Sequence, residues 1–251
     1  MIDEDISVKL PFLWGTQTFC KSKWSQINII VGPNGSGKTL LAEELARSFS
    51  SSGKKTTFLH SATINEESFI KILSEKPDIH SKIESVLSNL LGKSIKLKKE
   101  KNKLIPTVIN KERNLEYNMY KNECHGLKKI ITLLVELYAS KSKVLIIDEP
   151  ELHLHPRFQG LFVDMLDKVI AICHKEKKDV RIIVETHSEV IVNRLGIKIM
   201  DDNSYLKTDD VNVMLFNAKE EGFDTDVISS SFNDEGYLTN WPFGFFSDNV
   251  Y

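Results

Sequence analysis

The sequence has little of what a secreted or membrane-embedded protein needs. It contains only three cysteines, Cys20, Cys124 and Cys173, and their wide spacing fits neither a disulfide framework nor a zinc site. The longest apolar cluster, residues 130–138, is far shorter than a membrane span. The N-terminus, Met-Ile-Asp-Glu-Asp, lacks the pattern of a signal peptide. We therefore expect a cytoplasmic protein with no membrane partner.

A strong charge of one sign is also missing. The formal net charge is −2 at pH 7, with 33 Lys and Arg against 35 Asp and Glu. The whole molecule therefore has no field that would attract nucleic acid or an anionic membrane. The hydrophobic fraction of 41% and the charged fraction of 27% are ordinary for a folded protein. The length of 251 residues is enough for one large core, and we predict a single domain over residues 1–251.

A glycine-rich segment follows the largely apolar residues 27–31. It fits the pattern Gly-x4-Gly-Lys-Thr, in which glycines let backbone N–H groups converge on a phosphate at a helix N-terminus. In this pattern Lys38 reaches the β- and γ-phosphates, and the Thr39 hydroxyl ligates Mg²⁺. We predict that this phosphate loop binds a nucleoside triphosphate through Gly32, Pro33, Asn34, Gly35, Ser36, Gly37, Lys38 and Thr39.

A second apolar run, residues 144–147, is typical of a buried strand in a parallel sheet. It places Asp148 and Glu149 at the carboxyl end of the strand, where open α/β sheets bind their ligands. Because side chains alternate along a strand, the two carboxylates can take different roles. We expect Asp148 to hold Mg²⁺ through water and Glu149 to polarise the water that attacks the nucleotide.

Residues 62–121 are expected to form a small insertion of helices and a β-hairpin. The stretch Lys93–Arg113 is rich in lysine, and the alternation Ile-Lys-Leu-Lys at residues 95–98 predicts a hairpin with solvated lysines on one face. Contact with DNA phosphates is the alternative, and without interleaved aromatics it would be blind to sequence. The aromatic tail, residues 234–251, either packs on the domain or docks a partner.

Three segments together resemble the motifs of an ABC-type ATPase head. They are the phosphate loop, Asp-Glu-Pro-Glu-Leu-His-Leu-His-Pro at residues 148–156, and Glu-Thr-His-Ser at residues 185–188. The second segment is similar to the SMC and OLD-like branch, since transporter subunits usually carry a Ser-Ala-Leu-Asp type loop there. The resemblance implies an α/β P-loop NTPase fold with a mainly parallel central sheet and an N-terminal antiparallel β element. Many members of this branch are ATPase components of prokaryotic anti-phage defence systems.

The resemblance also implies a mechanism in which two heads sandwich two ATP molecules. Each nucleotide then touches one subunit's phosphate loop and the other subunit's signature loop. His187 is expected to contact the γ-phosphate and to act with Glu149 and Lys38 in catalysis. His153 and His155 match the family's loop that crosses the dimer interface. A metal site at this His-x-His pair is the alternative, but no third ligand is apparent.

The sequence departs from the family at the signature loop. Relatives commonly show Ser-x-Gly before a helix, whereas residues 123–126 are Glu-Cys-His-Gly. Gly126 and the following helix N-terminus can still cradle a γ-phosphate of the partner head. Cys124 replaces the hydroxyl with a weaker donor, so we expect slower turnover. The glutamine of the usual Q-loop is missing, and His60 or Ser61 lies near its expected position.

The predicted function is an ATP-hydrolysing head that dimerises on Mg-ATP and switches a separate effector, a nuclease or other toxic enzyme, in an anti-phage defence system. The alternatives are a DNA-repair or chromosome-maintenance SMC-like ATPase, a transporter ATPase subunit, and a nucleotide-gated scaffold that hardly hydrolyses ATP. The acidic pairs at residues 201–202 and 209–210 imitate a nuclease metal site, but they lack the context of a Toprim fold.

Overall fold

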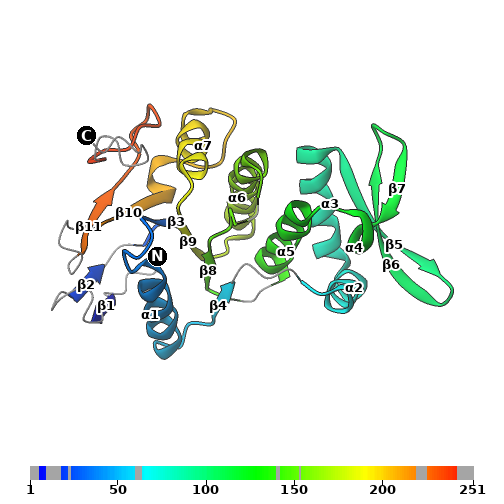
Figure 1. The fold of residues 1–251 in the computed structure, drawn as a ribbon, viewed down its shortest axis with the longest axis horizontal. Helices are drawn as coiled ribbons and strands as arrows, with labels where there is room; N and C mark the ends of the chain where they lie inside the picture. Colours follow the sequence, from blue (N-terminus) through cyan, green and yellow to red (C-terminus); the bar gives the residue numbers. More distant parts are fainter. Residues whose placement is uncertain are drawn as a thin grey trace.

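The computed structural model describes residues 6–9, 18–21, 24–59, 64–139, 142–152, 154–218 and 225–241. A six-stranded sheet in the order β11-β10-β3-β9-β8-β4 forms its centre (Figure 1). The strands are β3 (Ile27–Val31), β4 (Thr56–Leu59), β8 (Val144–Asp148), β9 (Arg181–Thr186), β10 (Val211–Ala218) and β11 (Thr225–Ser230). Only the β10–β11 pair is antiparallel among these neighbours, so the predicted mainly parallel central sheet is confirmed.

Helices cover both faces of this sheet. They are α1 (Lys38–Ser51), α5 (His125–Ala139), α6 (Pro156–Glu176) and α7 (Glu189–Met200). Ile30 of β3 packs with α1 in one apolar cluster, while Ile27 and Ile29 pack with α5, α6 and α7 in another. Since neighbouring strand residues point to opposite faces, a strand that is covered by helices on both sides is buried along its whole length. All residues of β3 and β9 are accordingly buried.

The elements between β4 and α5 lie at one end of the molecule (Figure 1). They are α2 (Glu66–Glu75), α3 (Pro77–Leu91), β5 (Lys93–Glu100), β6 (Lys103–Asn110), β7 (Leu115–Asn118) and α4 (Met119–Asn122). β5 and β6 pair antiparallel around Lys101 and Asn102, whose φ angles of 42° and 67° are those of a two-residue hairpin turn. The predicted hairpin is confirmed, and β7 adds a third strand to it.

A separate two-stranded antiparallel sheet precedes the central sheet. It pairs β1 (Ile6–Lys9) with β2 (Thr18–Lys21), as expected for the N-terminal antiparallel β element. Figure 1 shows it near α1, at the end of the molecule away from β5, β6 and β7. In the part of the chain that the structure describes, no helix combines the length and the apolar character that crossing a bilayer requires.

Side chains fix the start of the two helices that follow the predicted motifs. Pro156 opens α6, where a missing N–H is tolerated, and Nδ1 of His155 accepts from the Arg157 N–H at 3.2 Å. The Ser188 hydroxyl accepts from the Ile191 N–H at 3.2 Å at the start of α7. These caps hold the ends of both motif segments in place.

Candidate functional site

The phosphate loop, residues 32–39, joins β3 to α1, and its backbone requires glycine at three positions. Gly35 and Gly37 have φ angles of 77° and 89°, which residues with a Cβ rarely adopt. At Gly32 a Cβ would lie 2.6 Å from Cβ of Phe216 and 2.8 Å from its carbonyl oxygen, so no larger residue fits. The loop therefore leads into the N-terminus of a helix, an arrangement that suits a phosphate.

Lys38 stands at the first position of α1 and is only 3% exposed. Its Nζ donates to the Pro33 carbonyl at 2.8 Å, and the Ser36 hydroxyl donates to the same oxygen at 2.8 Å. Burial lowers the pKa of Lys38, although the negative charges of Glu185 and Glu149 oppose this effect. An ammonium group held this way gains favourable interactions when an anionic ligand enters the loop.

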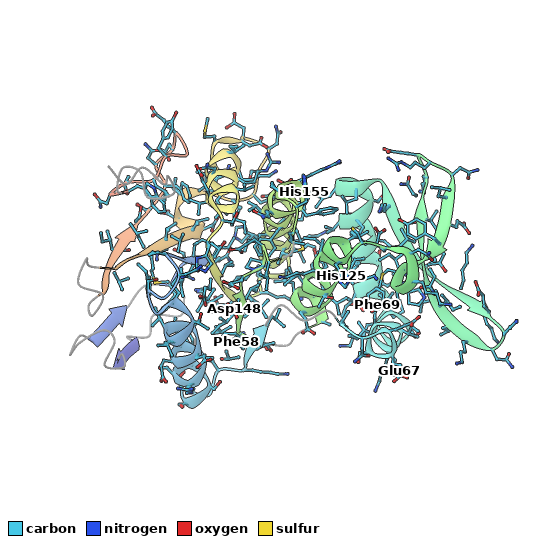
Figure 2. All side chains as sticks on the ribbon, in the orientation of Figure 1. Phe58, Glu67, Phe69, His125, Asp148 and His155 are labelled. Atoms are coloured by element: carbon cyan, nitrogen blue, oxygen red, sulfur yellow. The ribbon has the colours of Figure 1, made fainter. Side chains whose placement is uncertain are left out.

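Two carboxylates from neighbouring strands lie beside α1. Asp148 ends β8, and Glu185 stands opposite it on β9 in the parallel register. The Thr39 hydroxyl donates to Oε1 of Glu185 at 2.8 Å. Burial raises the pKa of Glu185 to about 7, and the nearby charge of Asp148 adds to this rise. Figure 2 shows Asp148 between α1 and α5, near the centre of the molecule.

Glu149 and His187 are in direct contact. Oε1 of Glu149 lies 2.9 Å from Nε2 of His187, and Nδ1 of His187 lies 2.9 Å from the Gly32 carbonyl oxygen. Both ring nitrogens therefore contact oxygen atoms, which hold the imidazole ring between Glu149 and Gly32. The Glu149 N–H donates to the Glu185 carbonyl at 3.0 Å, so the turn after β8 is tied to β9. The structure thus brings Glu149 and His187 to the phosphate loop, as the motif analysis predicted.

Lys129 is part of this site although it lies outside the predicted motifs. Its Nζ donates to the Glu149 carbonyl at 2.9 Å and to the Leu152 carbonyl at 3.2 Å. The residue is 6% exposed, and burial lowers its pKa while Glu151 and Glu149 act in the opposite direction. One feature of the sequence could have indicated Lys129, because it is a lysine among the apolar positions of a predicted helix. A buried lysine needs hydrogen-bond acceptors inside the protein.

Glu151 and Glu185 are two further carboxylates whose contacts the sequence did not predict. Oε1 of Glu151 accepts the His187 backbone N–H at 2.6 Å. Both residues lie within the motif segments, but their partners are 36 and 146 positions away along the chain. The motifs predicted that both residues lie near the phosphate loop. Their contact partners become visible only in the folded structure.

The signature loop, residues 123–126, is fixed by a carboxylate. The N–H of Cys124 donates to Oε1 of Glu123 at 3.0 Å, while Lys93 Nζ at 2.8 Å and the Tyr117 hydroxyl at 2.6 Å both donate to Oε2. Burial alone would raise the pKa of Glu123, but these hydrogen bonds hold it below its ordinary value. Glu123 thereby ties the exposed Cys124 to β5 and β7.

Gly126 is buried in the first turn of α5. A Cβ at this position would lie 3.3 Å from Cδ2 of Leu154 and 3.4 Å from Cδ2 of Phe158, so the glycine lets α5 approach the start of α6. Because α1 and α5 belong to apolar clusters on opposite faces of the sheet, Cys124 and Gly126 are not grouped with the phosphate loop of the same chain.

Three further predicted positions cannot be placed, and His155 has a structural contact. His153, His60 and Ser61 lie outside the described residues. His155 is the N-cap of α6, as described above. Within the described ranges, no three His, Cys, Asp or Glu side chains are grouped as a ready-made metal site. Because His153 lies outside these ranges, the metal alternative at the His-x-His pair stays a prediction.

Comparison with family models gives two matches. A family described as "ABC transporter" matches residues 20–151, which is more than half of the chain. A second family, described as "AAA domain, putative AbiEii toxin, Type IV TA system", matches residues 120–193.

One curated protein and two solved structures are similar to the chain. Endonuclease GajA of Bacillus cereus (strain HuB5-5) is 29% identical over 167 residues, which are 59% of this chain and 24% of that protein. The chain therefore spans about a quarter of that relative's length. The SMC head domain of Thermotoga maritima has a TM-score of 0.58, and an SmcHead bound to the C-winged helix domain of ScpA has 0.60. Each match has 12% sequence identity and covers 91% of this chain and 98% of the solved chain. This similarity shows that the fold is shared.

Proposed function

The chain belongs to the ABC-type ATPase family, whose members hydrolyse ATP, and from this premise we propose that it is an ATP-driven head that dimerises on Mg-ATP and switches a separate effector. The observation that carries the proposal is the convergence of Lys38, Glu149 and His187 at the phosphate loop. Strands that are distant along the chain deliver these groups to one edge of the sheet, where open α/β folds bind ligands.

The residues present fit ATP and Mg²⁺. Gly32 has no room for a Cβ, and Gly35 and Gly37 have positive φ angles, so the loop keeps the glycine backbone that a phosphate cradle needs. Residues 32–39 would hold the phosphates, and Thr39 with Asp148 would hold the ion through oxygen atoms, the ligands that Mg²⁺ prefers. The bound ion would neutralise charge on the β- and γ-phosphates.

Glu149 and His187 would divide the chemistry of hydrolysis. Glu149 would accept a proton from the attacking water, and His187 would donate to the γ-phosphate. Their mutual contact at 2.9 Å supports this, because each residue holds the other beside the loop. Lys38 would leave the Pro33 carbonyl and turn to the phosphates, where its charge is compensated.

The second head would supply the start of α5. Cys124 is exposed, and helix N-termini favour anions, so residues 124–126 of one head can approach the γ-phosphate held by the other. Lys129 lies one turn further along α5 and donates to the Glu149 carbonyl. Closure of the dimer would therefore act on Glu149 through α5.

The effector would be a nuclease or another toxic enzyme of a defence system. The support is the similarity to endonuclease GajA, of which the chain spans 24%. To test this, tagged Glu149→Gln protein would be purified from its native cells, with Lys38→Ala as the control that cannot hold nucleotide. A stoichiometric toxic enzyme that co-purifies with the first variant alone is the expected result. A permease in its place would overturn the proposal in favour of transport.

DNA binding by an SMC-like maintenance ATPase is a second candidate, and exposed lysines of the hairpin favour it. Lys96, Lys99, Lys101, Lys103 and Lys111 are exposed in the stretch Lys93–Arg113. Other lysines of the stretch are neutralised, since Lys93 pairs with Glu123 and Lys98 with Glu116. Affinity for duplex DNA that falls steeply with salt, together with DNA-stimulated hydrolysis, would support this candidate.

A further inference from the structure

The contact between Thr39 and Glu185 fixes the direction of a hydroxyl that the phosphate loop needs. A hydroxyl that ligates a cation uses an oxygen lone pair, and its proton must find an acceptor elsewhere. Oε1 of Glu185 accepts that proton at 2.8 Å, although 146 positions separate the two residues. Since a carboxylate only accepts, the contact leaves the lone pairs of Thr39 free for another partner.

The second oxygen of Glu185 is an unusual buried acceptor. Glu185 is 1% exposed, and among the described residues no donor reaches its Oε2. Its neighbour in the strand register is another carboxylate, Asp148. A buried carboxylate without a donor is costly unless a cation compensates it. The arrangement is therefore incomplete as a set of hydrogen bonds and suits a cation that prefers oxygen.

The charged groups around Asp148 and Glu185 include more carboxylates than amines. Four carboxylates gather here. Glu149 contacts the His187 ring, and Glu151 accepts the His187 N–H. Asp148 and Glu185 are paired in the strand register. Two amines face them, but each already donates to carbonyl oxygens: Lys38 to Pro33, and Lys129 to Glu149 and Leu152. A divalent cation beside Asp148 and Glu185 would compensate their negative charge.

We propose that Glu185 is a member of the Mg²⁺ site, where it orients the Thr39 hydroxyl and adds a second buried carboxylate beside Asp148. This assignment rests on the proposed ATP binding and goes beyond it. Glu185 acts on the ion through Thr39 and through its charge, so it is a positioning residue. Loss of the Glu185 charge should therefore change the Mg²⁺ concentration that nucleotide binding requires. A purely structural residue would leave that concentration unchanged.

The test uses Glu185→Gln, which keeps the shape and retains an oxygen that can accept from Thr39, but removes the charge. Binding of a fluorescent ATP analogue is titrated with Mg²⁺ at fixed protein concentration. We expect the Mg²⁺ concentration for half-maximal binding to rise about 10- to 100-fold, as for other residues that support a metal ligand. Affinity for the analogue in EDTA should increase, because one repelling charge is gone.

Glu151→Gln is the matched control. It removes the same charge from the same group of carboxylates but leaves the Thr39–Glu185 contact intact, so its Mg²⁺ requirement should shift clearly less. Equal shifts in the two variants, or an unchanged requirement in Glu185→Gln, would overturn the assignment while ATP binding stands. Wild-type protein that binds no analogue at any Mg²⁺ concentration would instead refute the proposed function. Thermal unfolding of each variant shows whether it is folded.

Discussion

Glu149 has a φ angle of 41°, in the left-handed region that costs a residue with a side chain about 1–2 kcal/mol. Hydrogen bonds of its backbone hold it there. Its N–H donates to the Glu185 carbonyl at 3.0 Å, and its carbonyl accepts from Lys129 at 2.9 Å. The position of the carboxylate beside His187 therefore depends on residues from β9 and α5 as well as on the motif itself.

Glu149→Gln tests the role of this carboxylate as the general base. The amide cannot accept a proton, so we expect kcat for ATP to fall about 100-fold or more, while nucleotide affinity stays near that of the wild type. Steady-state ATPase rates and equilibrium binding separate the two effects. Equal rates for wild type and variant would rule out the general-base role.

Lys129→Met tests whether Lys129 positions Glu149. Methionine fills a similar space but removes the ammonium donor from the Leu152 carbonyl and leaves the Glu149 carbonyl with only the Leu152 N–H at 3.1 Å. A small displacement of a catalytic group lowers the rate strongly, so kcat should fall about 10- to 100-fold with little change in ATP affinity. The conservative variant Lys129→Arg should recover part of the rate. A parallel loss of affinity and stability would instead indicate a role in folding.

At the scale of elements, close packing of the phosphate loop on β10 explains why Gly32 is required. In Gly32→Ala the new Cβ would meet Phe216 at 2.6 Å, and backbone must move to relieve this. We expect a loss of about 1–3 kcal/mol in the free energy of unfolding, measured with urea, together with weaker ATP binding.

Gly160→Ala is the control for this loss. A Cβ at Gly160 of α6 meets nothing within 4 Å, so alanine should stabilise the helix by about 0.5–1 kcal/mol. If both alanine variants had the same stability, the close approach to β10 would not be the reason for the glycine.

The residue before α5, Cys124, is expected to limit the rate of ATP hydrolysis. Cys124→Ser restores the hydroxyl that relatives show, and a gain of one hydrogen bond to the partner's phosphate would raise kcat about 2- to 10-fold. Cys124→Ala should not raise it. Both rates would be measured at saturating Mg-ATP. A serine variant no faster than the alanine variant would exclude this loop from the phosphate contact.

Helices and strands were predictable because each has a short, characteristic spacing of apolar residues in the sequence. The apolar runs before Gly32 and Asp148 predicted β3 and β8, and the alternation at residues 95–98 predicted the hairpin of β5 and β6. The fold class and the resemblance to an ABC-type head are confirmed. Contacts such as Thr39 with Glu185 depend on the order and register of strands, which no local pattern contains.

At the scale of the whole molecule, the sheet divides the site into two parts. The phosphate loop and α1 lie on one face, and α5 with the signature loop lies on the other. One chain therefore presents a nucleotide-binding edge and, separately, a helix N-terminus. In the proposed dimer each head would complete the site of the other, with the exposed Cys124 free to face the partner while Gly126 packs against Leu154 and Phe158.

The most direct test is the mass of Glu149→Gln protein by light scattering, with Mg-ATP, without nucleotide, and with ATP plus EDTA. We predict twice the chain mass of 28.6 kDa with Mg-ATP and the monomer mass in the other two conditions. Lys38→Ala should remain monomeric in all three. A Glu149→Gln protein that binds Mg-ATP yet stays monomeric would contradict the ATP-dependent dimer.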